Sequence, residues 1–206
     1  SSATGPTCFA PDNDDKYSKL SEEQGYIFLN VSNSAGPANC NRTVQLIYNV
    51  NLSKFLPSQS AYAIVLKDII VGKPNFAGAQ PLGAFFIYLQ QNNSFDFESI
   101  PQEGIGGKQL YMNDSSDSPF WLTNGDEIKV IISKLNNVAY VYRNGTLVNQ
   151  TELPNFDSMY FKVVLGTYFK PSPDIRGGLN LGLNITVLHN YTTFTNNLTL
   201  TIGNTT

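Results

Sequence analysis

The sequence predicts an all-β fold, an antiparallel β-sandwich of the jelly-roll type, and three observations support this prediction. Apolar and polar residues alternate with a period of two along much of the 206-residue chain. Helical spacing of apolar residues is weak, and only residues 15–24 suggest one short helix. Stretches that contain Pro and Gly separate the alternating runs, as turns separate the strands of sandwiches. We therefore expect one sandwich domain over residues 1–189, followed by a separate C-terminal strand over residues 190–206.

The expected strands follow one another along the chain. In the first, Val44, Leu46 and Tyr48 lie on one face, and polar residues lie on the other. Further apolar or alternating runs cover residues 61–71, 83–89, 127–132, 138–142, 147–149, 159–169 and 179–188. Between two of these runs, Asn144-Gly145 is the residue pair that a two-residue type I′ hairpin turn prefers, because both positions need positive φ.

Composition and charge exclude several classes of protein. Apolar residues make up 41% of the chain and aromatic residues 12%, which is too many for a disordered protein. The net charge is −3 and basic residues form no cluster, so we expect no nucleic-acid partner. No run of about 20 apolar residues occurs, so we expect no membrane span.

The motif Asn-X-Ser/Thr, which accepts N-linked glycans, occurs far more often than composition explains. Chance predicts about four such sequons, whereas eleven are present: Asn30, Asn41, Asn51, Asn92, Asn113, Asn144, Asn149, Asn184, Asn190, Asn197 and Asn204. The alternative is that an Asn- and Thr-rich strand composition produces the motif by accident. We predict covalent N-glycans and an extracellular location at the cell surface, and the pattern of Asn51, Asn184 and Asn197 points their side chains away from the apolar face.

Cys8 and Cys40 are the two cysteines of the chain. With a single histidine, they are too few ligands for a structural zinc site. A disulfide between them is the simpler interpretation in an exported protein, and it would tie the N-terminal segment to the domain.

Candidate catalytic and metal-binding residues each have a simpler explanation. Asp96 and Glu98 share one strand face at a separation of about 7 Å, which suits a glycosidase, but a solvated strand face is more common. His189 has no nucleophile motif beside it. Asp12, Asp14 and Asp15 lack the glycine and the distal glutamate of a calcium loop. We expect no enzyme, no catalytic residue, no metal and no cofactor.

The end of the chain has a clear strand pattern, in which Leu198, Leu200 and Ile202 alternate with polar residues. It is either the last strand of its own sheet or a donor strand that completes the sheet of a neighbouring copy. Repeated donation makes a filament, because the contact is head to tail.

With its many sequons, its cysteine pair and this detachable strand, the chain resembles the archaeal thread-type pilins in overall pattern. The resemblance implies a pilin-like sandwich and a glycosylated surface-filament subunit that polymerises with identical subunits, for adhesion or biofilm formation. It also implies that Leu198, Leu200 and Ile202 belong to the donor strand, although residues 1–7 could donate instead.

Residues 121–189 also resemble concanavalin-like jelly rolls, including the alginate-lyase branch. The similar pieces are 125–128, 141–145, 185–189 and Tyr160-Phe161-Lys162, although Val163-Val164-Leu165 replaces the small residues of the lyases. This resemblance implies the alternative function, a secreted polysaccharide-binding domain or a glycan-cleaving enzyme. Trp121, Tyr140, Tyr142, Tyr160 and Tyr168 could stack on sugar rings there, or they pack in the core.

Overall fold

A computed structural model describes residues 2–3, 18–23, 26–32, 42–51, 60–81, 83–90, 107–114, 122–153, 158–167, 177–193 and 200–201. All regular structure in these ranges is β-strand, and they contain no helix. A helix long and apolar enough to cross a membrane is therefore not found in the described part of the chain.

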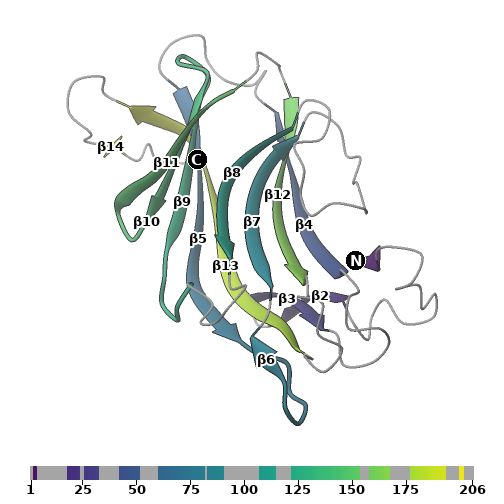
Figure 1. The fold of residues 1–206 in the computed structure, drawn as a ribbon. Coiled ribbons are helices and arrows are strands. Elements are labelled where there is room, and N and C mark those ends of the chain that lie inside the picture. Colours follow the sequence, from purple (N-terminus) through teal and green to yellow (C-terminus); the bar gives the residue numbers. More distant parts are fainter. Residues whose placement is uncertain are drawn as a thin grey trace.

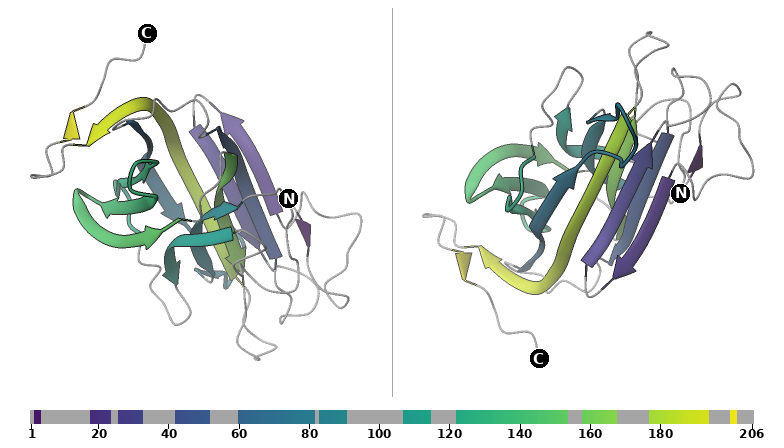
Figure 2. Two further views of the ribbon diagram at one scale, coloured as in Figure 1. Left: turned by 90° about the horizontal axis from the view of Figure 1, so that it is seen from above. Right: turned by 90° about the horizontal axis from the view of Figure 1, so that it is seen from below.

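The strands form two sheets that lie face to face (Figures 1 and 2). The five-stranded sheet has the order β1 (Ser2–Ala3), β4 (Arg42–Asn51), β12 (Ser158–Thr167), β7 (Ala84–Gln90) and β8 (Gly107–Asp114). The second sheet has the order β11 (Thr146–Glu152), β10 (Val138–Arg143), β9 (Ile128–Ser133), β5 (Ser60–Gly72), β13 (Gly177–Thr193), β3 (Tyr26–Ser32) and β2 (Ser18–Glu23). Two short strands, β6 (Gln80–Pro81) and β14 (Leu200–Thr201), also pair with β13. Every pairing except β6 with β13 is antiparallel, which confirms the predicted sandwich.

One hydrophobic core fills the space between the sheets. Alternate residues of each long strand enter it, such as Ile64 and Leu66 of β5 and Phe161 and Val163 of β12. Each of these side chains is at most 1% exposed. The period of two that predicted the strands therefore also predicts which face of each strand is buried.

The longest strand pair, β5 with β13, contains a β-bulge. Its register shifts between Gly182 and Asn184, and Asp68 of β5 has a φ of 54°. The Asn184 Nδ2 donates a hydrogen bond of 3.0 Å to Asp68 Oδ2 across the pair. This contact holds the extra residue of β5, after which the strand resumes its alternation with Ile69 in the core.

The β10–β11 hairpin has the predicted turn. Arg143 pairs with Thr146, and the two residues between them, Asn144 and Gly145, have φ values of 50° and 80°. The residue pair was therefore sufficient to predict this turn, since few residues other than Asn and Gly tolerate positive φ.

The helix expected over residues 15–24 is wrong for Ser18–Glu23, which form β2. This strand pairs with β3 in register, with Leu20 opposite Leu29. Leu29 is fully buried in the core, and β3 needs a partner on the side away from β13. Pairing with β3, the next strand along the chain, has overridden the weak local preference for helix.

Candidate functional site

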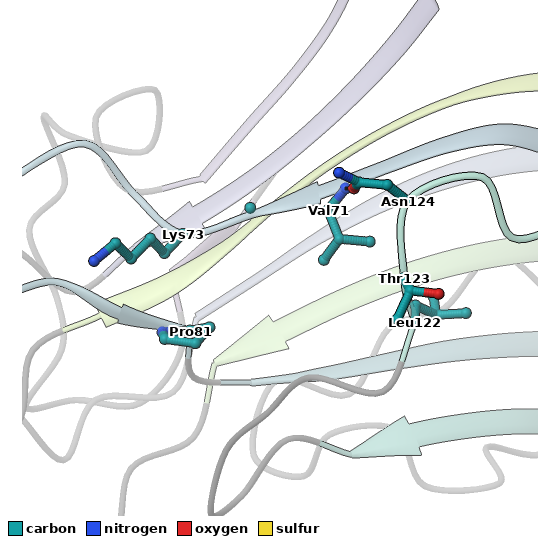
Figure 3. Close-up of a pocket in the computed structure, with 7 residues that line it drawn as sticks. Val71, Lys73, Pro81, Leu122, Thr123 and Asn124 are labelled. Atoms are coloured by element: carbon teal, nitrogen blue, oxygen red, sulfur yellow. Dashed lines mark hydrogen bonds between the residues drawn. The ribbon is translucent and has the colours of Figure 1, made fainter.

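An open depression of about 550 Å³ lies at one end of the sandwich (Figure 3). Three segments meet there: the end of β5, the short strand β6 and the turn that precedes β9. The lining residues are Val71, Gly72, Lys73, Pro81, Leu122, Thr123 and Asn124. In Figure 3 the Lys73 side chain extends away from Asn124, so that its ammonium group lies at the rim.

The turn over residues 122–126 continues the edge of β5 through two hydrogen bonds. The Val71 N–H donates to Asn124 Oδ1 at 2.8 Å, and the Gly125 N–H donates to the Ile69 carbonyl at 2.8 Å. Gly125 has a φ of 86°, which an L side chain rarely adopts. The turn is therefore fixed to β5 by backbone groups and one amide, and it forms a wall of the depression.

Asp126 ties the same turn to the β10–β11 hairpin. Its carboxylate accepts hydrogen bonds from the Thr123 N–H at 2.9 Å, from Arg143 Nε at 3.1 Å and from Asn144 Nδ2 at 2.9 Å. The Thr123 hydroxyl and the second nitrogen of the Arg143 fork also donate to it. Asn144 completes the contact, because its Oδ1 accepts from the Glu127 N–H at 2.8 Å.

This arrangement decides the charge state of Asp126. Burial alone would raise the pKa of the carboxyl group, but the hydrogen bonds from Thr123, Asn144 and Arg143 and the charge of Arg143 lower the pKa below 3.8. Asp126 is therefore an ionised anchor with its oxygens engaged, and its role at the depression is to position Thr123.

Asn113 of β8 fixes the start of the turn from the other sheet. Its Oδ1 accepts a hydrogen bond of 3.2 Å from the Leu122 N–H, and its Nδ2 donates to the Tyr111 hydroxyl at 3.2 Å. The residue is 2% exposed. The Asn113 amide is therefore buried and engaged at both of its polar atoms, and the glycan predicted there stays a prediction.

The opposite wall depends on the parallel pair between β6 and β13. Gly177 lies against Gln80 so closely that a Cβ atom on Gly177 would overlap the Gln80 carbonyl. Further along β13, Asn180 Nδ2 donates a hydrogen bond of 3.1 Å to the Lys73 carbonyl. These contacts hold Pro81 and the Lys73 backbone in place at the depression.

The lining combines apolar surface with exposed polar groups. Leu122 is buried and Val71 and Pro81 are partly buried, whereas Lys73, Thr123 and Asn124 are exposed. No carboxylate and no histidine is among the lining residues that the structure describes. Nor do three or more His, Cys, Asp or Glu side chains in the described ranges gather as metal ligands would. The arrangement is suited to hold a ligand with both apolar and hydrogen-bonding faces.

The strand with the sequence Tyr160-Phe161-Lys162 lies in β12 of the five-stranded sheet. Phe161 enters the core, and Lys162 lies on the opposite face beside Tyr88 of β7. Lys162 is 1% exposed and Tyr88 is 3% exposed, and burial lowers the pKa of Lys162. The Lys162 and Tyr88 side chains on this part of the outer face are therefore buried.

The other residues considered for chemistry have different outcomes. Tyr142 is 9% exposed and packs with Ala61, Ala63 and Ile131 in a cluster on the outer face of the larger sheet, with Tyr140 against it. Of His189 the structure describes the backbone in β13. Outside the described residues lie Asp12, Asp14, Asp15, Asp96, Glu98, Trp121 and Tyr168.

Five predicted glycan acceptors have described side chains. Asn113, Asn144, Asn149 and Asn184 each use the amide in a hydrogen bond, with Asn149 Nδ2 donating to the Leu110 carbonyl across the two sheets. Asn30 is the fifth, and it is partly exposed on β3. Asn51 and Asn190 are described by their backbone, while Asn41, Asn92, Asn197 and Asn204 lie outside the described residues.

The C-terminal strand pairs with its own chain in this structure. Leu200 and Thr201 form β14, which pairs with Thr193 and Thr192 of β13. This is the first of the two alternatives that the sequence left open for the strand. Leu198 and Ile202 lie outside the described residues, as do Cys8 and Cys40 and the disulfide predicted between them.

Comparisons with known proteins found solved structures but no family. No model of a protein family and no curated protein matches the sequence. Peanut lectin has a TM-score of 0.48 with 9% identity, over 83% of this chain and 90% of that chain. The Emp47p carbohydrate recognition domain has a TM-score of 0.44 with 13% identity, over 81% of this chain and 86% of that chain. An alginate lyase, AlgAT5 from polysaccharide lyase family 7, has a TM-score of 0.42 with 12% identity, over 91% of this chain and 93% of that chain.

A sialidase is also similar, with a TM-score of 0.44 and 10% identity, but this chain spans only 16% of its length. These similar structures are named as lectins and glycan-active enzymes and not as pilins. Likeness at this level carries no inference about a ligand.

Sequence reasoning did not predict the depression. Lys73 and Pro81 lie in the stretches with Pro and Gly that separate the expected strands over residues 61–71 and 83–89, and the sequence pattern assigns no role to Thr123 and Asn124. Asn124-Gly125 was the available signal, because it repeats the turn pair found at Asn144-Gly145. Its meaning depends on β5 lying beside β9, which a sequence does not state.

Proposed function

We propose that the chain is an extracellular carbohydrate-binding domain whose ligand occupies the depression between β5, β6 and the turn over residues 122–126. The observation that supports this proposal is the composition of the lining, in which Val71, Pro81 and Leu122 form apolar surface beside the exposed groups of Thr123 and Asn124. A sugar ring offers C–H groups to such a surface and hydroxyl groups to its polar rim.

The anchoring of the turn is the second support. Residues 122–126 are fixed to β5, to β8 and to the β10–β11 hairpin, so binding costs little loss of backbone freedom. The eleven sequons favour an extracellular location.

Titration of the purified chain with a panel of neutral and acidic oligosaccharides tests the proposal, with saturation-transfer NMR and calorimetry as the measurements. A Cβ on Gly72 meets no atom within 4 Å, so the side chain of Gly72→Leu would leave the backbone of this lining residue into open space. We expect this variant to lose binding and to keep its melting temperature.

Lys67→Ala serves as the control, since Lys67 is exposed on β5 and does not line the depression. We expect this variant to bind as the unchanged chain does. Failure of every oligosaccharide to bind, or equal binding by Gly72→Leu, would contradict the proposal.

We propose head-to-tail strand donation as the second candidate, on the observation that the described pairing of the terminal strand with its own chain covers only two residues of each strand. So short a contact is readily exchanged for a longer one with a neighbouring copy. Electron microscopy of the full chain beside a chain that ends at His189 tests this. Fibres in the full chain alone support donation by the C-terminal strand, and monomers in both samples contradict it.

A further inference from the structure

Tyr26, Phe28 and Ile70 form an apolar strip on the outer face of the larger sheet. The core side chains of β3 are Ile27 and Leu29, so Tyr26, Phe28 and Asn30 lie on the opposite face. The rings of Tyr26 and Phe28 are stacked, with centroids 6.1 Å apart and an interplanar angle of 29°. Ile70 of β5 is 49% exposed on the same face.

Gly182 of β13 connects the two ends of this strip. It pairs with Phe28 on one side and with Ile70 on the other, and β3, β13 and β5 are neighbours in the sheet (Figure 2). A Cβ on Gly182 would lie 2.9 Å from Phe28 Cε1 and 3.2 Å from Cδ1. The Phe28 ring therefore lies across the backbone of β13, in the space that a side chain would otherwise fill.

Asn30 follows two residues after Phe28 on the same strand face, at a distance of about 7 Å along the strand. Asn30 pairs with Lys19 of β2 on one side and with Asn180 of β13 on the other, and the Asn180 amide is directed to the Lys73 carbonyl. Within the described part of the chain, no hydrogen bond involves the Asn30 side chain. This separates Asn30 from Asn113, Asn144, Asn149 and Asn184, whose amides are all engaged.

We infer that Asn30 carries an N-linked glycan and that its first sugar packs on the strip of Tyr26, Phe28 and Ile70. The sequon Asn30-Val31-Ser32 supplies the acceptor, the Asn30 amide, which makes no hydrogen bond to the described residues, supplies the attachment point, and the flat Phe28 ring supplies an apolar surface for the C–H face of the sugar. The glycan covers the exposed Ile70 and adds contacts that the bare polypeptide lacks. This inference does not depend on the proposed ligand site.

Expression in a eukaryotic host that attaches N-glycans allows the first part of the test. We expect glycopeptide mass spectrometry to find Asn30 occupied, in Ser32→Thr as in the unchanged chain, and to find it unmodified in Ser32→Ala. The peptides of the other sequons report whether the host glycosylates this chain at all. An unmodified Asn30 beside an occupied sequon elsewhere would overturn the inference.

A double-mutant cycle tests the packing. Phe28→Ala should lower the melting temperature by about 2–4 °C more in the Asn30-glycosylated chain than in the Ser32→Ala background, because only the glycosylated chain loses the stacked sugar. Phe28→Leu keeps apolar volume and removes the ring face, so it preserves the test if the alanine variant fails to fold. Equal losses in both backgrounds would overturn the packing.

Proton NMR of the glycosylated chain tests whether the first sugar packs on Phe28 without relying on a difference in melting temperature. The ring current of Phe28 should shift the proton signals of the first sugar upfield in the glycosylated chain. Phe28→Leu should return these signals to the positions of an exposed glycan. Signals that are unshifted in the unchanged chain would place the sugar away from the ring.

Discussion

Asp126 is the residue on which the turn at the depression depends most. Asp126→Ala removes the acceptor for Thr123, Arg143 and Asn144 and leaves a partly buried guanidinium without this partner. We expect the free energy of unfolding at pH 7 to fall by about 2–3 kcal/mol, as for other charged hydrogen-bonded groups. Urea denaturation of the two proteins measures the difference.

The same pair of proteins has a defined pH dependence. The pKa of Asp126 is lower in the folded state than its ordinary value of 3.8, so its ionised form stabilises the fold above that pH. The stability difference between the unchanged chain and Asp126→Ala should stay constant from pH 7 to about 5 and shrink as the pH falls below 3.8. A difference that grows in acid would show that Asp126 is not the stabilising carboxylate.

The buried amide of Asn113 leads us to expect that this sequon stays unmodified. Because its amide is buried between Tyr111 and the Leu122 backbone, Ser115→Ala should remove no glycan from the protein and should leave its melting temperature unchanged. Ser32→Ala is the matched variant, and there we expect the loss of one glycan. The loss of a whole glycan in Ser115→Ala would show that Asn113 is modified and that this part of β8 is open when glycans are attached.

At the scale of elements, the short strand β6 is held by a close backbone approach at Gly177. Gly177→Ala places a Cβ against the Gln80 carbonyl, so β6 must move and Pro81 must move with it. We expect a loss of about 1–3 kcal/mol in unfolding free energy, as for other overpacked sites. In Gly72→Ala, the control, the new methyl group meets no atom within 4 Å, and thermal denaturation should show little change. Equal effects of the two substitutions would contradict the close approach.

The strands also show how far the sequence predicts structure and why it stops. The expected strand over residues 61–71 is β5, because its alternation reflects burial against a single core. Alternation also points Asn184 away from the core, since Leu183 and Ile185 lie in or against it. In contrast, β3 was not predicted, since it begins with four consecutive apolar residues that show no alternation, and neighbouring β2 was expected to be helical. Short strands depend on their partners, and the order of strands in a sheet is not a local property.

The candidate site was harder to predict for the same reason. Val71, Pro81 and Asn124 are far apart in the sequence and meet only because β5 lies between β9 and β13. Asn180 then fixes the Lys73 backbone and Asp126 fixes Thr123 through hydrogen bonds. The spacing of these residues along the sequence does not predict these contacts. The sequence pattern predicted the turn at Asn144-Gly145, because two adjacent residues determine its conformation. It did not predict the depression, because the depression forms only when the strands of the sheet lie in this order.

At the scale of the whole molecule, residues from eight strands of both sheets share one core, so we expect the domain to unfold as one cooperative unit. The described contacts of residues beyond Thr193 are the two pairs between β13 and β14. A chain that ends at Thr193 should therefore keep a single thermal transition, with a melting temperature lower by at most about 4 °C. Circular dichroism and calorimetry measure the transition, and sedimentation compares the oligomeric state with that of the full chain. A truncated chain that is unfolded, or that melts in two steps, would show that the terminal strand completes the sandwich.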